Sequence, residues 1–345
     1  MKNPALKYFR WAFLITAAGL ILSSLRGSLT HGNLHGSLSF LFICAVLSVL
    51  EISLSFDNAI VNANVLKRMQ PIWQKRFLTW GILIAVFGMR IIFPVAVVAV
   101  AARIGPLAAV HLAATDPQAY AHIMDDAHLG IAAFGGTFLM MVALNYFVDE
   151  AKDVDWFKML EKRLRQCASI RGLEITFVLA IIVGFAMVLP APDNMTFVLA
   201  ALFGLITFTV VEMVGKILDH ADAAADAARA GGLGAFLYLE MLDASFSFDG
   251  VIGAFALTQN MFLIAIGLGV GAMYVRSMTI MMVERETLAQ FRYLEHGAFY
   301  SIFVLSIIMF AQTLVHIPEM ITGLLGACLI GVALWSSVRY NRRAA

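Results

Sequence analysis

Two acidic phrases of eight residues dominate the chemistry that this sequence could perform. The first phrase is Glu51–Asn58, with the sequence EISLSFDN, and the second is Asp243–Gly250, with the sequence DASFSFDG. Both phrases place Ser-x-Ser-Phe-Asp two residues after an acidic residue, and both lie within long apolar stretches. A carboxylate inside a bilayer is costly and needs a partner, and a cation is the natural partner for several carboxylates.

The side chains of the two phrases predict a site for a hard divalent cation. Neither phrase contains Cys or His, and the candidate ligands all offer oxygen: they are Glu51, Asp57, Asn58, Glu240, Asp243 and Asp249. Glu240 joins the set because it lies three residues before Asp243, on the same helix face. Oxygen ligands favour Mg²⁺, Ca²⁺ or Mn²⁺ over Zn²⁺ or Cu⁺. We expect no resident cofactor, and the cation would be a bound or transported substrate.

An arginine follows each phrase inside the next apolar stretch, Arg90 in the first half of the chain and Arg276 in the second. Several carboxylates at one locus repel each other when no metal is bound, so some must be protonated or paired with these arginines. This favours a proton-coupled cycle, in which metal and protons displace each other. Arg90 and Arg276 could equally be structural counter-ions, without a role in transport.

The spacing within each phrase predicts a broken helix. The acidic residue at the start and the aspartate near the end are six residues apart, which is about 240° around an ideal helix. Both acids can meet one ion only if the helix unwinds near Ser-Phe-Asp. Asn58 and Gly250 follow the aspartates directly, and both tolerate unusual backbone angles.

Composition places the chain in a bilayer. Of the 345 residues, 61% are hydrophobic and only 14% are charged, whereas a soluble domain has about 25% charged residues. The formal net charge of +1 gives no basic surface for nucleic acid, so we expect none as a partner. The expected partners are the lipid bilayer and a divalent metal ion, and the sequence does not fix the oligomeric state.

The apolar stretches predict an all-α polytopic membrane protein with about ten transmembrane helices. The expected spans are 9–25, 38–66, 77–102, 128–148, 173–190, 194–216, 233–258, 260–283, 298–316 and 319–338. We treat the chain as a single membrane domain. Residues 1–172 hold the first four spans and a linker, and residues 173–345 hold the other six. Within the linker, 149–172 is expected to form an amphipathic surface helix.

The distribution of Lys and Arg predicts that both termini are cytoplasmic. With the N-terminus inside, the loop lysines and arginines gather on the cytoplasmic side, apart from Arg26 and Arg103. The two phrases then run in opposite directions, because five spans separate them. Spans one to five and six to ten would form two inverted repeats, the layout of many transporters.

At these phrases the chain resembles the TerC family of bacterial integral membrane proteins, named for tellurium resistance. The resemblance rests on Glu51, Asp57-Asn58 and the second phrase, and it extends from about residue 38 to 338. It is strongest to the longer branch with Ser-Phe-Asp-Asn and Ser-Phe-Asp-Gly phrases. The resemblance implies manganese export, metal homeostasis and a place in the bacterial plasma membrane.

Three functions fit the pattern. The leading interpretation is a divalent-cation transporter that exports Mn²⁺ from the cytoplasm, which is not an enzyme. The first alternative is an intramembrane aspartyl protease, since two membrane aspartates can share a proton. The second is a non-transporting membrane protein that delivers metal to others or supports tellurite resistance. Its distinguishing property would be metal binding without flux.

Overall fold

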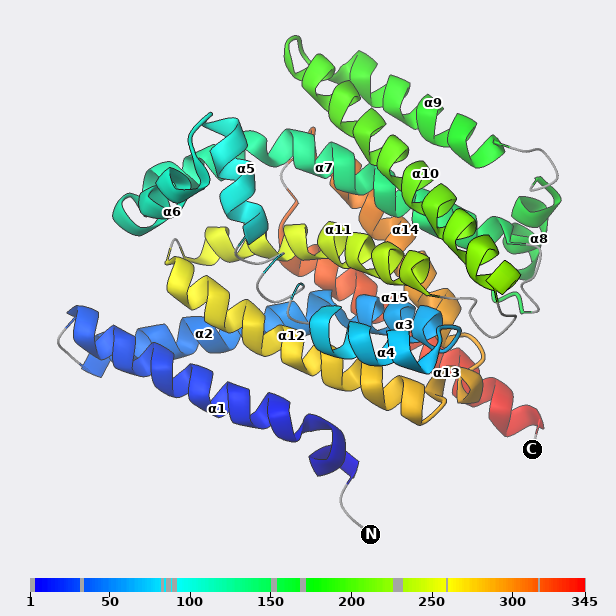
Figure 1. The fold of residues 1–345 in the computed structure, drawn as a ribbon, viewed down its shortest axis with the longest axis horizontal. Coiled ribbons are helices and arrows are strands. Elements are labelled where there is room, and N and C mark those ends of the chain that lie inside the picture. Colours follow the sequence, from blue (N-terminus) through cyan, green and yellow to red (C-terminus); the bar gives the residue numbers. More distant parts are fainter. Residues whose placement is uncertain are drawn as a thin grey trace.

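The protein is a bundle of α-helices (Figure 1). The computed structural model describes residues 4–31, 34–81, 84, 88, 92–149, 154–167, 172–225, 232–258, 260–315 and 317–344. Within this part of the chain there is no β-strand. The all-α fold class expected from the sequence is therefore confirmed.

The helices follow the apolar stretches of the sequence. Several begin where a proline occupies the first turn, a position that suits its missing N–H group. The helices are α1 (Pro4–His31), α2 (Leu34–Leu54), α3 (Phe56–Leu66), α4 (Pro71–Arg76), the π-helix η1 (Phe77–Gly81), α5 (Phe93–Ala101), α6 (Pro106–Thr115), α7 (Pro117–Val148), α8 (Lys158–Cys167), α9 (Leu173–Val188), α10 (Asp193–Ala225), α11 (Leu233–Leu257), α12 (Met261–Glu284), α13 (Thr287–Gln290), α14 (Leu294–Gln312) and α15 (Glu319–Ala344).

Seven of the described helices are long and apolar enough to cross a membrane, namely α1, α2, α7, α10, α12, α14 and α15. The chain is thus a multi-pass membrane protein. Two further predicted spans coincide with α9, which has 16 residues, and with α11, which carries three acidic residues. The remaining one, 77–102, lies partly outside the described residues. The number of ten spans therefore stays a prediction.

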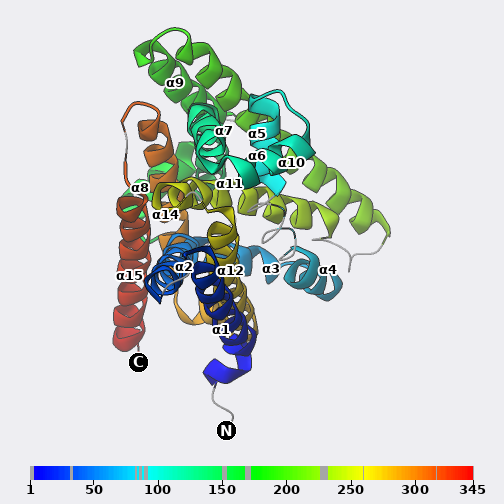
Figure 2. The same cartoon turned by 90° about the vertical axis from the view of Figure 1, so that its left-hand side faces the viewer.

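The helices are arranged in layers around α11. In both views α11 lies between α7 on one side and the pair α2 and α12 on the other (Figures 1 and 2). The helix α7 is central: 72% of its most apolar stretch is buried inside the protein. In α1 only 22% of the corresponding stretch is buried. The exposed apolar side chains of α1, α10 and α15 form the surface suited to lipid.

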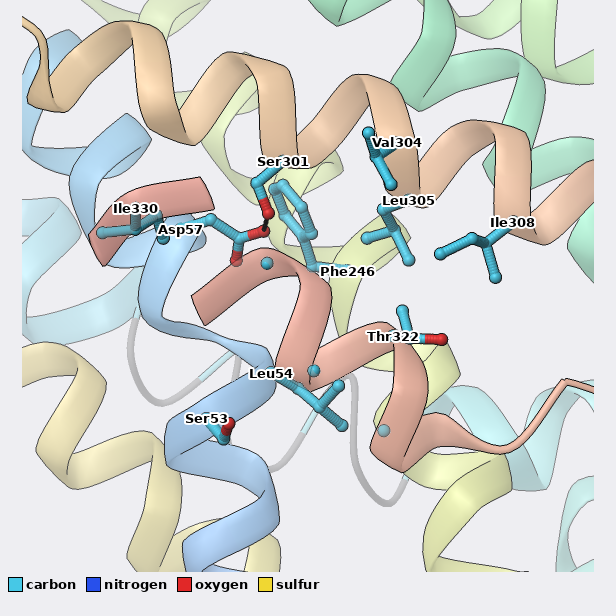
Figure 3. A pocket seen from close by; sticks show the side chains of 13 residues that line it. Ser53, Leu54, Asp57, Phe246, Ser301, Val304, Leu305, Ile308, Thr322 and Ile330 are labelled. Carbon is cyan, nitrogen blue, oxygen red and sulfur yellow. Dashed lines mark hydrogen bonds between the residues drawn. The ribbon is translucent and has the colours of Figure 1, made fainter. Parts of the chain in front are cut away.

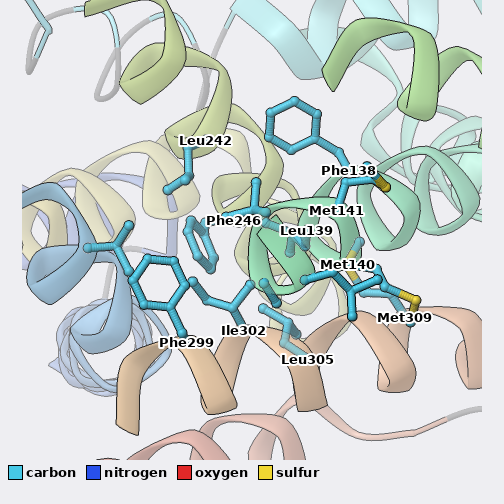
Figure 4. Packing of buried hydrophobic residues seen from close by; sticks show 14 of the residues in the cluster. Phe138, Leu139, Met140, Met141, Leu242, Phe246, Phe299, Ile302, Leu305 and Met309 are labelled. Carbon is cyan, nitrogen blue, oxygen red and sulfur yellow. The ribbon is translucent and has the colours of Figure 1, made fainter. Parts of the chain in front are cut away.

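The hydrophobic core lies where α7, α11 and α14 meet (Figure 4). Phe246 of α11 points into it beside Leu139 of α7 and Ile302 of α14. Phe246 belongs to the second acidic phrase, so this core fixes one face of that phrase.

Several pairs of long helices that follow each other in sequence run in opposite directions, such as α1 and α2, or α11 and α12 (Figure 1). Both termini lie at one end, and the short helices α4, α8 and α13 lie toward the same end. Arg103 lies in the connection between α5 and α6, and α6 lies toward the opposite end. The α2–α3 segment and α11 are antiparallel, as two inverted halves require.

The first acidic phrase interrupts its helix, and the second does not. Ser55 separates α2 from α3 with φ −98° and ψ 13°. The interruption is short, because Ser55 N bonds to Glu51 O at 3.0 Å and Ala59 N bonds to Ser55 O at 3.2 Å. The predicted break in the second phrase is wrong, since α11 runs unbroken from Leu233 to Leu257. Gly250 instead provides close approach: a Cβ there would lie 3.0 Å from Glu51 Oε2.

The amphipathic helix expected within 149–172 is present as α8, but an acid forms its buried contact. Glu161 is fully buried, and its Oε1 accepts hydrogen bonds from Trp156 N, Phe157 N and Tyr300 Oη, each at 3.1 Å. His296 Nε2 lies 3.4 Å from Glu161 Oε2 and 2.7 Å from the Val154 carbonyl oxygen. We call these residues the α8–α14 cluster, because they attach α8 and the segment before it to α14.

Candidate cation site

Glu51 lies at the interface between the two phrases. It is 1% exposed, and the Ser55 hydroxyl donates to its Oε1 at 2.8 Å. Two glycines make room for it: a Cβ at Gly271 of α12 would lie 2.4 Å from Glu51 Cβ, and Gly250 of α11 faces its Oε2. Small residues on two neighbouring helices thus bring the carboxylate of the first phrase against the backbone of the second.

Asp57 is held by donors on both carboxylate oxygens. It lies in the first turn of α3, where the helix dipole favours a negative charge. Its Oδ1 accepts from Asn58 N at 2.8 Å, and its Oδ2 accepts from the Ser301 hydroxyl of α14 at 2.9 Å (Figure 3). Asp57 is 5% exposed, so its orientation is set by protein groups rather than by bulk water.

A small cavity opens beside Asp57 (Figure 3). Its free volume is about 20 Å³, which is room for about one water molecule or one ion. Both acidic phrases line it, because Asp57 and Gly250 are among its walls, together with Ser301 and Thr322. The Thr322 hydroxyl is buried without a hydrogen-bond partner and stands at the cavity (Figure 3). An unused oxygen at this position is suited to contact a cation.

A second contact joins the two phrase-bearing helices further along α3. Asn62 Nδ2 donates to Asp243 Oδ1 at 2.9 Å, and both residues are buried. The amide oxygens of Asn58 and Asn62 are themselves buried without a donor. Glu240, one turn before Asp243, is 8% exposed and likewise has no hydrogen-bond partner on either carboxylate oxygen.

The predicted single site, with all six ligands at one ion, stays a prediction, because the side chain of Asp249 lies outside the described residues. Among them, no group of three or more His, Cys, Asp or Glu side chains could hold one metal ion. The register explains the separation. Glu51 meets Gly250 and Asn62 meets Asp243, so Asp57 and Asp243 lie at different heights along the antiparallel helices. Asp249 lies on α11, but its side chain is outside the described part of the structure.

The arginines do not form the predicted pairs within the described structure. Arg276 donates from Nε to the Leu78 carbonyl oxygen at 3.1 Å, and it forms no ion pair with any described carboxylate. The described partner of Arg276 is therefore the backbone of η1, and its predicted pairing with a phrase stays a prediction. Arg90 lies outside the described residues.

Three residues of the site were not predicted from the sequence: Asn62, Ser301 and Thr322. Asn62 follows Asn58 by one helical turn in an otherwise apolar span, and this spacing could have drawn attention to it. Ser301 and Thr322 lie in ordinary apolar helices with no repeated pattern around them. Only the packing of α14 and α15 beside α3 brings them to the cavity.

Comparison with known proteins places the chain in a family. A family model described as "Protein of unknown function (DUF475)" matches residues 56–344. The chain belongs to the DUF475 family. The matched part of this DUF475 protein includes Asp57, Asn62 and the whole second phrase, and Glu51 lies before it. Neither the curated proteins nor the solved structures gave a match.

Proposed function

We propose that this DUF475 protein transports a divalent cation across the membrane, with export of Mn²⁺ from the cytoplasm as its main activity. One observation carries the proposal. Asp57 and Gly250, from two phrases about 190 residues apart in a multi-pass membrane protein, line one buried cavity with room for a single ion. Repeated polar phrases that meet at a common buried point are typical of transporters.

The chemistry of the cavity favours a hard cation. Asp57 supplies a carboxylate, while Ser301 and Thr322 supply hydroxyl oxygens, and none of the described lining residues carries sulfur or imidazole. Glu51 adds a second carboxylate at the adjoining interface with Gly250. These groups suit Mn²⁺, Mg²⁺ and Ca²⁺, and the resemblance to the TerC family selects Mn²⁺ among them.

Transport also explains why the acids are buried without a described arginine. Charged carboxylates in a dry interior are costly, so the empty site must take up protons or another cation. We therefore include proton exchange in the proposal, with protons replacing Mn²⁺ as the site turns from one side to the other. The proposed location is the bacterial plasma membrane, with both termini in the cytoplasm.

The proposal is tested by metal flux into liposomes that contain the purified full-length protein and a metal-sensitive dye. We expect Mn²⁺ to enter, with Mg²⁺, Ca²⁺ and Zn²⁺ measured alongside, and a pH dye in parallel vesicles to report counter-movement of protons. Asp57→Asn should abolish the flux, because the neutral amide replaces the carboxylate at the cavity.

A matched control is Asp126→Asn, since Asp126 is an exposed aspartate whose described partner is His122 at 3.0 Å. Parent-like Mn²⁺ flux in Asp57→Asn would contradict the proposal. Metal binding by the parent without any flux would instead support a delivery role, and peptide cleavage that Asp57→Asn abolishes would support a protease.

A further inference from the structure

A second group of buried oxygens lies on α3 beyond the Asp57 cavity. Asn62 is 4% exposed, and its Nδ2 donates to Asp243 Oδ1, whereas its own Oδ1 accepts no hydrogen bond. Since Nδ2 and Oδ1 belong to one amide group, the unsatisfied oxygen lies beside the Asp243 carboxylate. Burying an amide oxygen without a hydrogen-bond donor is costly, and a cation bound there would offset that cost.

Glu240 brings a second carboxylate to the same region. It precedes Asp243 by one turn of α11, and the charges of the two carboxyl groups interact. Both Glu240 oxygens are buried, and no group in the described part of the chain forms a hydrogen bond with them. A Cβ at Gly81 of η1 would lie 2.5 Å from Glu240 Oε1, so the end of the π-helix closes against this acid. A buried acid with no donor is expensive to maintain without a ligand.

We propose that Asn62, Asp243 and Glu240 form a second cation site, so that the protein holds two cations in series. This inference rests on the proposed transport function and extends it. Asn62 follows Asp57 by five residues, which is about 7.5 Å along a helix and about 140° around it. Asp57 accordingly contacts Ser301 of α14, whereas Asn62 contacts Asp243 of α11, so two ions can be bound at once.

The ligand set of the second site matches the first in kind. Two carboxylates and one amide oxygen are hard donors, suited to Mn²⁺, Mg²⁺ or Ca²⁺. Two sites in series also help release, because an ion that enters one site repels the ion in the other. The second site lies on the side of the Asp57 cavity nearer the C-terminal end of α3.

Further polar contacts on α3 extend from the second site toward the end of the molecule that carries both termini. Asn64 Nδ2 donates to Glu295 Oε1 at 2.6 Å, and Lys67 Nζ lies 3.6 Å from Glu295 Oε2. The Asn64 residue thus offers a matched amide on the same helix, in contact with an acid on α14 instead of α11. It serves as the control below.

The test counts bound ions on the purified full-length protein by titration with Mn²⁺, with electron paramagnetic resonance reporting the free ion. We expect two Mn²⁺ per chain for the parent and one for Asn62→Ala and for Glu240→Gln. Asp57→Asn should also bind one, and the double variant Asp57→Asn with Asn62→Ala should bind none. Asn64→Ala should keep both ions, because its amide contacts Glu295.

Asn62→Asp is the second variant at the same position, and it should bind two ions because it keeps an oxygen donor there. The isosteric Glu240→Gln keeps the test decisive if Asn62→Ala does not fold. One Mn²⁺ per parent chain, or two on both Asn62→Ala and Glu240→Gln, overturns the second site.

The two proposals fail separately. A parent that moves Mn²⁺ in liposomes while binding one ion refutes only the second site. A parent that binds two ions but moves none refutes transport and leaves the second site in place. A parent that binds no Mn²⁺ refutes both.

Discussion

The hydroxyl of Ser301 holds one oxygen of Asp57, and the backbone N–H of Asn58 holds the other. The carboxylate is thereby fixed between α3 and α14 before any ligand arrives. Groups that orient a ligating carboxylate commonly matter almost as much as the carboxylate itself. The cavity therefore depends on a residue that carries no charge.

We predict that Ser301→Ala weakens Mn²⁺ binding at the Asp57 cavity by about 10- to 100-fold, because Asp57 loses a donor that fixes its orientation. The measurement is the same Mn²⁺ titration, read at the ion that Asp57→Asn removes. Ser306→Ala is the control: this buried serine lies on the same helix, and its hydroxyl bonds to the Phe303 carbonyl oxygen at 2.7 Å. Equal affinities in the two variants would contradict the role assigned to Ser301.

At this scale the sequence pointed to the acidic residues but not to the polar residues beside them, Asn62, Ser301 and Thr322. Glu51, Asp57 and Asp243 were predicted because a repeated phrase inside apolar sequence is visible without a structure. The partition of these acids between two places was not, since it depends on the register of α3 against α11. That register follows from close contacts such as Glu51 against Gly250, which no local pattern encodes.

At the scale of elements, the two phrases differ in backbone structure, although both lie at the contact between Glu51 and Gly250. The first phrase bends at Ser55, whose hydroxyl bonds to Glu51 one turn earlier. The second stays helical and uses Gly250 to let Glu51 approach. A glycine in a buried helix can serve either flexibility or proximity. Gly250 here allows the Glu51 carboxylate to approach closely, and α11 stays helical, so the predicted second break is wrong.

The α8–α14 cluster connects a surface helix to the helix that supports the site. Glu161 gathers two backbone N–H groups and the Tyr300 hydroxyl, and His296 lies beside it. Tyr300 directly precedes Ser301, the residue that holds Asp57. The attachment of α8 and the orientation of Asp57 therefore depend on the same turn of α14.

We predict that Glu161→Ala releases α8 from α14. The change removes the acceptor of several buried donors, and a buried bond left unmade costs about 1–3 kcal/mol. Tryptic cleavage at the lysines and arginines of α8 should then be faster by about tenfold to a hundredfold. Limited proteolysis of the purified protein measures this rate.

The control is Glu174→Ala, at the partly exposed start of α9, which should leave the cleavage rate of α8 unchanged. Cleavage of Glu161→Ala at the parent rate would mean that α8 is attached by other contacts.

At the scale of the whole molecule, both termini and the short helices α4, α8 and α13 lie toward one end. In the orientation that we propose, this end faces the cytoplasm, the side on which basic connections are enriched in membrane proteins. The opposite end carries α6, which follows Arg103. The molecule thus has two chemically distinct ends, as a protein with a fixed orientation in a membrane requires.

We predict that a membrane-impermeant maleimide labels Leu107→Cys in intact cells and labels Met159→Cys only after permeabilisation. Both positions are highly exposed, 87% and 77%, but they lie at opposite ends of the molecule. A background without native cysteines is needed for this experiment. Labelling of Met159→Cys in intact cells would reverse the proposed orientation.

The helical architecture could be predicted from the sequence because apolar length alone identifies a span. The helices α9 and α11 show where this signal weakens: α9 is short, and α11 carries the acids of the second phrase. The layered packing could not be predicted, since lipid-facing and core-facing apolar residues look alike in sequence. Which helices surround α11 is decided by shape, including the close approach of Glu51 to Gly250.

The Asp57 cavity has a free volume of about 20 Å³, which is room for about one water molecule. Under the proposed function, an ion that enters the cavity exchanges part of its water shell for the oxygens of Asp57, Ser301 and Thr322. Mg²⁺ gives up its waters more reluctantly than larger divalent ions, so the comparison of Mg²⁺ and Mn²⁺ flux in liposomes measures how much this exchange contributes to selectivity.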